Sequence, residues 1–193
     1  MFDRKTVGKL GGWTGFRVAE LDYRPGEGWG GRGKVIIQLE PTRQWMHCER
    51  CGARSKRLHD THTRRVRDLP LFDWDVVLLV PRRRLWCERC SGPQLEHLDW
   101  LSRYRRVTRR LEEAVSRLCS AMSLQQVAAF YGLGWHTVKA IDKAALQADL
   151  GEPDWSSIEY LAMDEFALRK GHNYATVVIE PARRQVLWVG PGR

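Results

Sequence analysis

The stretch HCERCG, residues 47–52, and the stretch WCERC, residues 86–90, contain the same knuckle, in which two cysteines are separated by two residues. Each such pair can direct two thiolates at one ion, and four thiolates form a closed tetrahedral zinc site. A thiol oxidoreductase is the alternative, but two pairs without a thioredoxin-like pattern favour metal. The sequence therefore predicts a structural zinc ion (Zn2+). The expected ligands are Cys48, Cys51, Cys87 and Cys90.

The residues around the knuckles indicate a zinc ribbon. Each knuckle follows a β-like stretch, at residues 34–39 and 76–80, and Gly52 after the first knuckle suits a tight turn. Because the insert between the knuckles is long, we expect a β-excursion over residues 64–84. Three histidines near the knuckles are weaker candidate ligands and are expected at the surface. They are His47, His59 and His62.

The N-terminal part predicts a further hairpin. Residues 16–23 and 34–39 are β-like and flank the Pro/Gly-rich loop PGEGWGGRG. We expect residues 1–100 to form one β-hairpin and zinc-ribbon domain.

No apolar run is long enough to span a bilayer, and the first thirty residues lack the apolar core of a signal peptide. A soluble, cytoplasmic protein without membrane contacts is expected.

Positive charge is concentrated in one segment of the chain. Residues 43–110 contain 17 Lys and Arg against 8 Asp and Glu, so this segment accounts for the whole net charge of +9. Such a cluster favours a polyanion, and nucleic acid is the usual one in the cytoplasm. A solvated basic face is the alternative. The candidate phosphate contacts are Arg82, Arg83, Arg84, Arg105 and Arg106.

Beyond residue 100 the apolar period changes from two to 3.6 residues. The pattern predicts a helix over residues 108–122, a short helix over 124–131 after the N-cap Ser123, and a third helix over 135–150. Gly132 supplies the turn between the last two. The offsets are those of a helix-turn-helix, so residues 101–151 are expected to form a DNA-binding domain. An ordinary helical hairpin is the alternative.

The third predicted helix is the one expected to enter the major groove. Val138 and Ile141 fall on its inner face, and polar or aromatic side chains fall on the outer face. The outward residues, which we expect to contact double-stranded DNA, are Trp135, His136, Lys139 and Lys143.

The C-terminal part predicts a small sheet after a linker at residues 152–157. Residues 158–163, 174–179 and 185–189 read as three strands of an antiparallel meander, with Asp164 on the first. This order is similar to the start of an RNase H-like fold, in which carboxylates from separate elements hold two divalent ions. The predicted fold is therefore multidomain α+β, ending in the first three strands of such a domain at residues 158–193.

Several stretches together resemble one family of bacterial insertion-sequence transposases, the ISL-three (ISL3) family of DDE-type enzymes. They cover nearly everything from the first knuckle onward. The matching stretches are HCERCG at 47–52, RRVRDLP at 64–70, RRRLWCERC at 82–90, SLQQVAAFYGLGWHTVKAID at 123–142 and MDEFALRKGHNYATVVIEPARRQVLWVGPGR at 163–193.

The resemblance implies roles for these parts. The cysteines would be zinc ligands, the helix-turn-helix would bind the terminal inverted repeats of the element, and Asp164 would be the first catalytic carboxylate. Family members are longer, and their second Asp and final Glu lie beyond Arg193, so the resemblance implies a C-terminally truncated chain. Glu165 points to the opposite face of a strand and cannot replace either.

The resemblance also implies limits on what this chain does. Mg2+ would be bound only in a complete catalytic domain, so specific DNA binding without strand cleavage is expected. A regulator that occupies transposon ends or a promoter is an alternative, and so is an enzyme completed by a partner chain. Homodimerisation and association with full-length transposase are both open.

Overall fold

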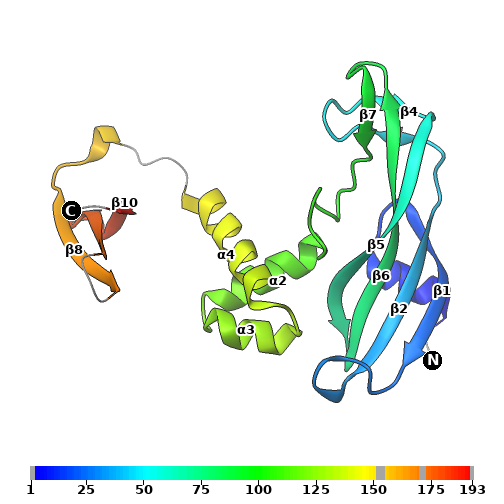
Figure 1. The fold of residues 1–193 in the computed structure, drawn as a ribbon, viewed down its shortest axis with the longest axis horizontal. Coiled ribbons are helices and arrows are strands. Elements are labelled where there is room, and N and C mark those ends of the chain that lie inside the picture. The colour runs from blue at the N-terminus through cyan, green and yellow to red at the C-terminus, as the bar shows by residue number, and fades with distance from the viewer. Residues whose placement is uncertain (1–2, 151–154, 170–172, 192–193) are drawn as a thin grey trace. The chain divides into compact units, whose positions relative to one another are not determined.

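The computed structural model describes residues 3–150, 155–169 and 173–191. The chain divides into two compact units, Met1–Ala144 and Ala145–Arg193. The first unit combines a sheet with helices, and the second contains a small sheet (Figure 1). The fold is thus mixed α+β, as expected. Among the described residues, no helix is both long enough and apolar enough to cross a membrane.

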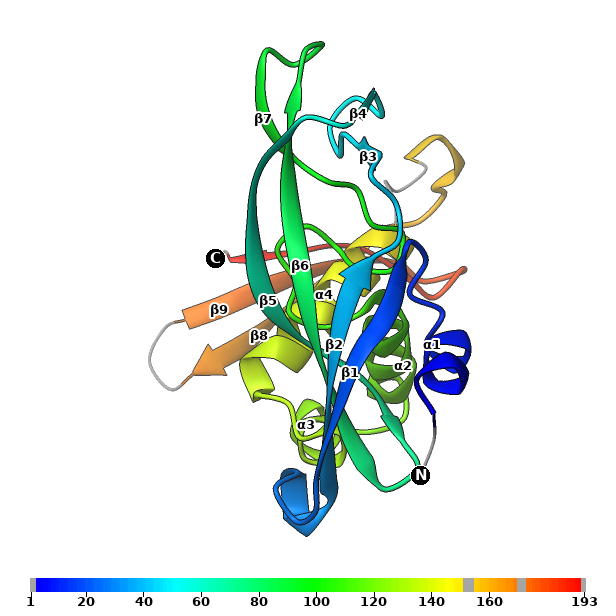
Figure 2. The same cartoon turned by 90° about the vertical axis from the view of Figure 1, so that its right-hand side faces the viewer.

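A twisted sheet forms most of the first unit (Figure 2). Its strands follow the order β1-β2-β6-β5, with β7 paired to the end of β6. The β1–β2 hairpin is antiparallel, which confirms the prediction, whereas β2 and β6 are parallel. The strands of this unit are β1 (Phe16–Arg24), β2 (Gly33–Pro41), β3 (Met46–His47), β4 (Arg54–Ser55), β5 (Leu58–Leu71), β6 (Trp74–Cys87) and β7 (Gly92–Leu95).

The core of this sheet comes from the apolar runs of its central strands. Ile37 of β2 and Leu78 of β6 are buried together with Val66 of β5. Helix α1 (Arg4–Gly11) packs against β1, and the 3-10 turn η1 (Trp29–Gly31) lies in the β1–β2 loop. Helix α1 and η1 were not predicted, because neither segment has an apolar period that marks a helix.

The β5–β6 hairpin is longer than the sequence predicts. Both strands have 14 residues, and β6 continues through three consecutive arginines to Cys87. The arginines stay in the strand because distant carboxylates pair with two of them, Arg83 with Glu96 and Arg84 with Asp60. The long hairpin therefore carries the second knuckle at its end.

Three helices follow the sheet along the chain: α2 (Arg109–Cys119), α3 (Leu124–Tyr131) and α4 (Trp135–Leu150), of which α4 begins in the first unit and ends in the second. The bounds of α3 and α4 confirm the prediction, whereas α2 ends three residues early. Ser123 and Gln126 form a reciprocal capping box at the start of α3, and Gly132 adopts a left-handed conformation at its end. The buried core of these helices consists of Val107, Leu111, Val115, Val127, Ala128, Tyr131, Val138 and Ile141.

The second unit contains an antiparallel meander with the order β10-β9-β8, as predicted. Its elements are η2 (Trp155–Ser157), β8 (Ala162–Arg169), β9 (Asn173–Glu180) and β10 (Gln185–Pro191). Strand β8 begins four residues later than expected and ends six residues later, so Asp164 lies inside the strand. Residues 152–154 of the predicted linker lie outside the described residues, and its last three residues form η2.

Candidate zinc ribbon and DNA-binding surface

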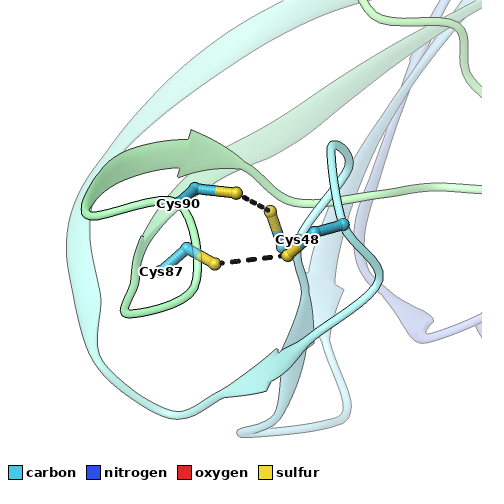
Figure 3. A group of neighbouring side chains, drawn as sticks. Cys48, Cys87 and Cys90 are labelled. Carbon is cyan, nitrogen blue, oxygen red and sulfur yellow. Dashed lines mark hydrogen bonds between the residues drawn. The ribbon is translucent and has the colours of Figure 1, made fainter.

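The four knuckle cysteines come together at the end of the β5–β6 hairpin. All four sulfurs lie within 4.8 Å of one another, and they form the one group of three or more potential metal ligands among the described residues. Figure 3 shows sulfurs from the two knuckles facing one another. The Sγ atoms of Cys48 and Cys90 are 3.9 Å apart, and those of Cys51 and Cys87 are 3.5 Å apart.

These distances fit a tetrahedral zinc ion. With Zn–S bonds of about 2.3 Å, neighbouring sulfurs of a tetrahedron lie roughly 3.8 Å apart. The observed pairs fall on either side of that value, and all the cysteines are free thiols. The four sulfur donors also exclude a hard cation as the preferred metal, since soft thiolates select zinc or related ions. His47 and His59 are exposed and outside the cluster.

Local backbone geometry orients the thiol groups of the two knuckles. Strand β3 ends directly before Cys48, and the amide of Gly52 donates to the Cys48 carbonyl at 2.8 Å while Gly52 takes a φ of +71°. In the second knuckle β6 ends at Cys87, and the amide of Ser91 donates to the Glu88 carbonyl at 3.1 Å. Both knuckles are therefore tight turns that follow a strand.

The unbound thiols differ in acidity. A hydrogen bond from the backbone of Ala53 lowers the pKa of Cys51 to about 7. Burial raises the pKa of Cys90 to about 12, and burial also raises the pKa of Cys87. Zinc binding must therefore displace protons from at least two of the sulfurs at neutral pH.

Helix α4 presents the side chains that the sequence assigns to DNA. Trp135, His136, Lys139 and Lys143 are all exposed, while Val138 and Ile141 are buried beneath them. The Trp135 ring contacts its neighbours, with its centroid 4.8 Å from that of His136 and 5.1 Å from Nζ of Lys139. The outward face of α4 thus combines positive charge with an aromatic surface.

The predicted phosphate contacts are only partly at the surface. Arg82 and Arg83 are buried, and Arg83 forms an ion pair with Glu96. Arg84 is paired with Asp60, and Arg105 with Glu112 at 3.1 Å. Burial thus corrects the assignment of Arg82 and Arg83, because a buried guanidinium cannot reach a phosphate at the surface. Arg106 is exposed and forms no ion pair with the part of the chain that the structure describes.

Arg82 is unusual among these residues. Its three side-chain nitrogens are buried and have no hydrogen-bond partner among the described residues. Burial lowers the pKa of Arg82, and the nearby Arg64 lowers it further. Glu49 and Glu96 act in the opposite direction, so these two carboxylates favour the charged form of Arg82.

A second exposed basic surface, which the sequence did not predict, lies on the zinc ribbon. Arg54 and Lys56 lie over the Trp45 ring at 4.8 and 4.3 Å, and Arg57 lies over the Trp86 ring at 5.1 Å. All three cations are exposed. The excess charge of residues 43–110 was the available signal, but it could not rank individual arginines. We call Trp45, Arg54, Lys56 and Arg57 the ribbon surface.

Asp164 is the candidate catalytic residue that the sequence predicts. Its side chain is exposed, and Oδ1 accepts a hydrogen bond from the Glu165 amide at 2.8 Å. Among the residues described, Asp164 belongs to no group of three potential metal ligands. The acidic residue that is buried in this sheet is Glu180, and its Oε2 accepts from the Tyr160 amide at 3.4 Å.

Comparison with known proteins follows the same division of the chain. Residues 44–90 match a family model described as the zinc-finger of transposase IS204/IS1001/IS1096/IS1165. Residues 96–146 match the helix-turn-helix domain of transposase family ISL3. The chain belongs to the ISL3 family. The ribbon and the helix-turn-helix described above are therefore the zinc-finger and the helix-turn-helix of an ISL3 chain.

Individual relatives of this ISL3 chain are transposases. The chain is 58% identical over its full length to the transposase for insertion sequence element IS1001 of Bordetella parapertussis. It is 25% identical over 169 residues to the transposase for insertion sequence element IS1557 of Mycobacterium tuberculosis. The chain spans 47% of the first relative and 37% of the second. No solved structure matches the chain.

Proposed function

We propose that this chain is the DNA-binding portion of an insertion-sequence transposase. The observation that carries the proposal is the exposed face of α4, which joins Trp135, His136, Lys139 and Lys143 on a helix whose other face is buried. Such a helix, preceded by a short helix and a glycine turn, reads base edges in the major groove. The ISL3 relatives assign this arrangement to transposases.

The four cysteines support a structural zinc ion. Cys48, Cys51, Cys87 and Cys90 would hold it in a closed site with no free coordination position, which suits folding and not chemistry. The ion would connect the β3 and β6 knuckles, which have only a small apolar cluster of their own around Met46 and Leu85. The ribbon surface then offers cations to the phosphate backbone.

The arrangement of strands in the second unit supports our proposal that this unit is the start of an RNase H-like domain. Asp164 is opposite Val177 on β9, and Val177 is opposite Val189 on β10, so the three share one face of the sheet. On the other face Met163, Val178 and Trp188 are aligned. A sheet with apolar side chains on both faces is typical of a larger domain in which helices cover both sides.

The proposed role of Asp164 follows from this position. As the first carboxylate of a DDE set it would contribute to Mg2+ binding in a complete catalytic domain. One exposed carboxylate binds a hard dication weakly and cannot position two ions. We therefore expect this chain alone to bind duplex DNA without cutting it, and the terminal inverted repeats of an insertion sequence are the expected target.

The test is a selection of preferred duplexes by the zinc-loaded chain from a random library, followed by titration of the selected duplex. We expect affinity for this duplex at least about 10³-fold above that for an unrelated duplex. Asp164→Asn should bind equally well, because Asp164 lies outside the DNA-binding surfaces. Failure to enrich any sequence would overturn the proposal, and loss of binding in Asp164→Asn would show that the DNA site lies elsewhere.

A further inference from the structure

The stretch RRVRDLP at residues 64–70 has no role in the zinc site or on the outward face of α4. In the structure its central residues, Arg67 and Asp68, lie on β5 where the sheet meets the helices. The amide of Arg67 donates to the Arg106 carbonyl at 2.8 Å, and its carbonyl accepts from the Thr108 amide at 2.9 Å. The segment that enters α2 is therefore bonded to the edge of the sheet.

The side chain of Arg67 extends this connection to the helix-turn-helix. Its Nη2 donates to the Tyr131 carbonyl at 3.0 Å, and its Nη1 donates to the Gly132 carbonyl at 3.3 Å. From the β1–β2 loop, Arg32 donates to the Phe130 carbonyl at 3.4 Å. These carbonyls lie at the C-terminal end of α3, where a helix leaves its acceptors unpaired and where a positive charge is favourable.

Asp75 holds Arg67 in place from the other side. Its Oδ1 is 3.3 Å from Nη2 of Arg67, and its Oδ2 accepts from the Trp29 amide at 2.6 Å. Asp75 is buried. Trp29 in turn lies against the glycine of the turn, because a Cβ added to Gly132 would be 2.6 Å from Cβ and Cγ of Trp29. The turn is thus enclosed by the sheet and its loop.

Asp68 makes the matching connection to α2. Its carboxylate is fully buried and accepts hydrogen bonds from Nε1 of Trp13 at 2.8 Å and from Oγ1 of Thr108 at 2.6 Å. Arg110 of α2 adds an ion pair. Each carboxylate oxygen has a charged or neutral donor, so the buried charge is well compensated.

We infer that Arg67 and Asp75 are positioning residues for DNA recognition. They hold α3 and α4 in one orientation on the sheet that carries the zinc ribbon, so that the α4 face and the ribbon surface engage one duplex at a fixed spacing. The inference rests on the proposed function. Separate DNA-binding modules are often joined by exposed linkers, whereas here charged hydrogen bonds join them. Fixed orientation removes the cost of ordering the second contact.

The experiment measures spacing tolerance. Footprinting of the zinc-loaded chain on the selected duplex locates the two contact regions, and three base pairs are then inserted between them. This insertion moves one region by about 10 Å and about 100° around the helix axis. We expect the unmodified chain to lose about 100-fold in affinity, since only one surface can then bind. Arg67→Met should bind the original duplex more weakly than the unmodified chain does. The same insertion should then lower the affinity of Arg67→Met by less than about 5-fold.

Two further variants separate positioning from folding. Arg65→Met is the matched control, because Arg65 is an exposed arginine on the same strand, and it should retain the spacing requirement. Asp75→Asn keeps an acceptor for the Trp29 amide and removes the charge opposite Arg67, so an intermediate tolerance is expected. Amide exchange of residues 124–144 should accelerate in Arg67→Met while the amides of β2 and β6 remain protected, which global unfolding would not produce.

The outcomes distinguish this inference from the proposed function. If no duplex is enriched, the proposed function fails and the inference fails with it. If a duplex is enriched but the unmodified chain tolerates the insertion, or if Arg67→Met keeps the same spacing requirement as Arg65→Met, DNA binding stands and positioning by Arg67 is overturned.

Discussion

At the scale of single residues, the burial and the ion pairs of a basic side chain decide whether it is available to DNA, and its charge alone does not. Arg82 and Arg83 belong to the most basic run of the sequence, yet both are buried, and Arg83 is paired with Glu96. Lys139 and Arg106 are exposed and remain candidate DNA contacts. The sequence could predict that a basic surface exists, but the pairing of individual arginines depends on carboxylates brought in by the fold.

Lys139 and Arg106 should therefore differ in their effects on DNA binding. Lys139→Ala removes a cation from the groove-facing side of α4, so the preference for the selected duplex over a single-base variant should fall by about 1–3 kcal/mol. Arg106→Ala should weaken binding to all sequences about equally, because a phosphate contact does not report sequence. Competition titrations with both duplexes measure this. Equal loss of preference in the two variants would contradict the assignment.

At the scale of elements, the sequence predicted the bounds that neighbouring residues determine, but not the bounds that depend on pairing between strands. The bounds of α3 and α4 followed from a capping residue, a glycine and a 3.6-residue period, which act within a few residues. The full lengths of β5 and β6 did not, because residues 59–63 of β5 and 82–84 of β6 are polar and are held in the strands by pairing across the hairpin. The start of β8 was misplaced for the same reason, since its register is set by β9.

Gly132 gives a direct test of the helix-turn-helix geometry. Its φ is +59°, and a Cβ would meet Trp29 at 2.6 Å, so Gly132→Ala should destabilise the fold by more than about 1 kcal/mol. Gly134→Ala is the matched control two residues away, because its Cβ would meet only Oγ1 of Thr137 at 3.8 Å. Urea unfolding should show a clear fall in the midpoint for the first variant. Equal midpoints would contradict the close packing of Trp29.

At the scale of the whole molecule, the positive charge serves two purposes. Several arginines of residues 43–110 hold the first unit together, as the pairs of Arg67 with Asp75 and Arg110 with Asp68 show. The charge count therefore overstates the cations available to DNA. The exposed cations of the ribbon surface and of the α4 face are Arg54, Lys56, Arg57, Lys139 and Lys143, and Arg106 is a further exposed candidate.

The salt dependence of binding should match this smaller set. If six cations each neutralise one phosphate, the logarithm of the binding constant should fall with a slope of about −5 against the logarithm of salt concentration. Between about 50 and 200 mM salt, affinity should then fall about 10³-fold. Titrations at four or more salt concentrations give the slope. A flat response would show that the exposed cations do not contact phosphates, and a much steeper slope would show that further cations of the chain contact the DNA.

Removal of zinc tests whether the zinc ribbon can unfold locally while the sheet core and the helical core stay folded. The knuckles share a small buried cluster around Met46 and Leu85, apart from the sheet core and from the helical core. A chelator should therefore accelerate amide exchange in residues 46–55 and 85–95, while exchange in α2 and α3 remains slow. Cys48→Ser should reproduce this effect and lose about one zinc ion per chain, whereas Cys119→Ser, which lies outside the cluster, should keep its metal. If helical amides exchange as fast as those of the knuckles, the ion stabilises the whole first unit, because the contacts of Arg67 and Asp68 between the sheet and the helices then transmit the loss of the ion.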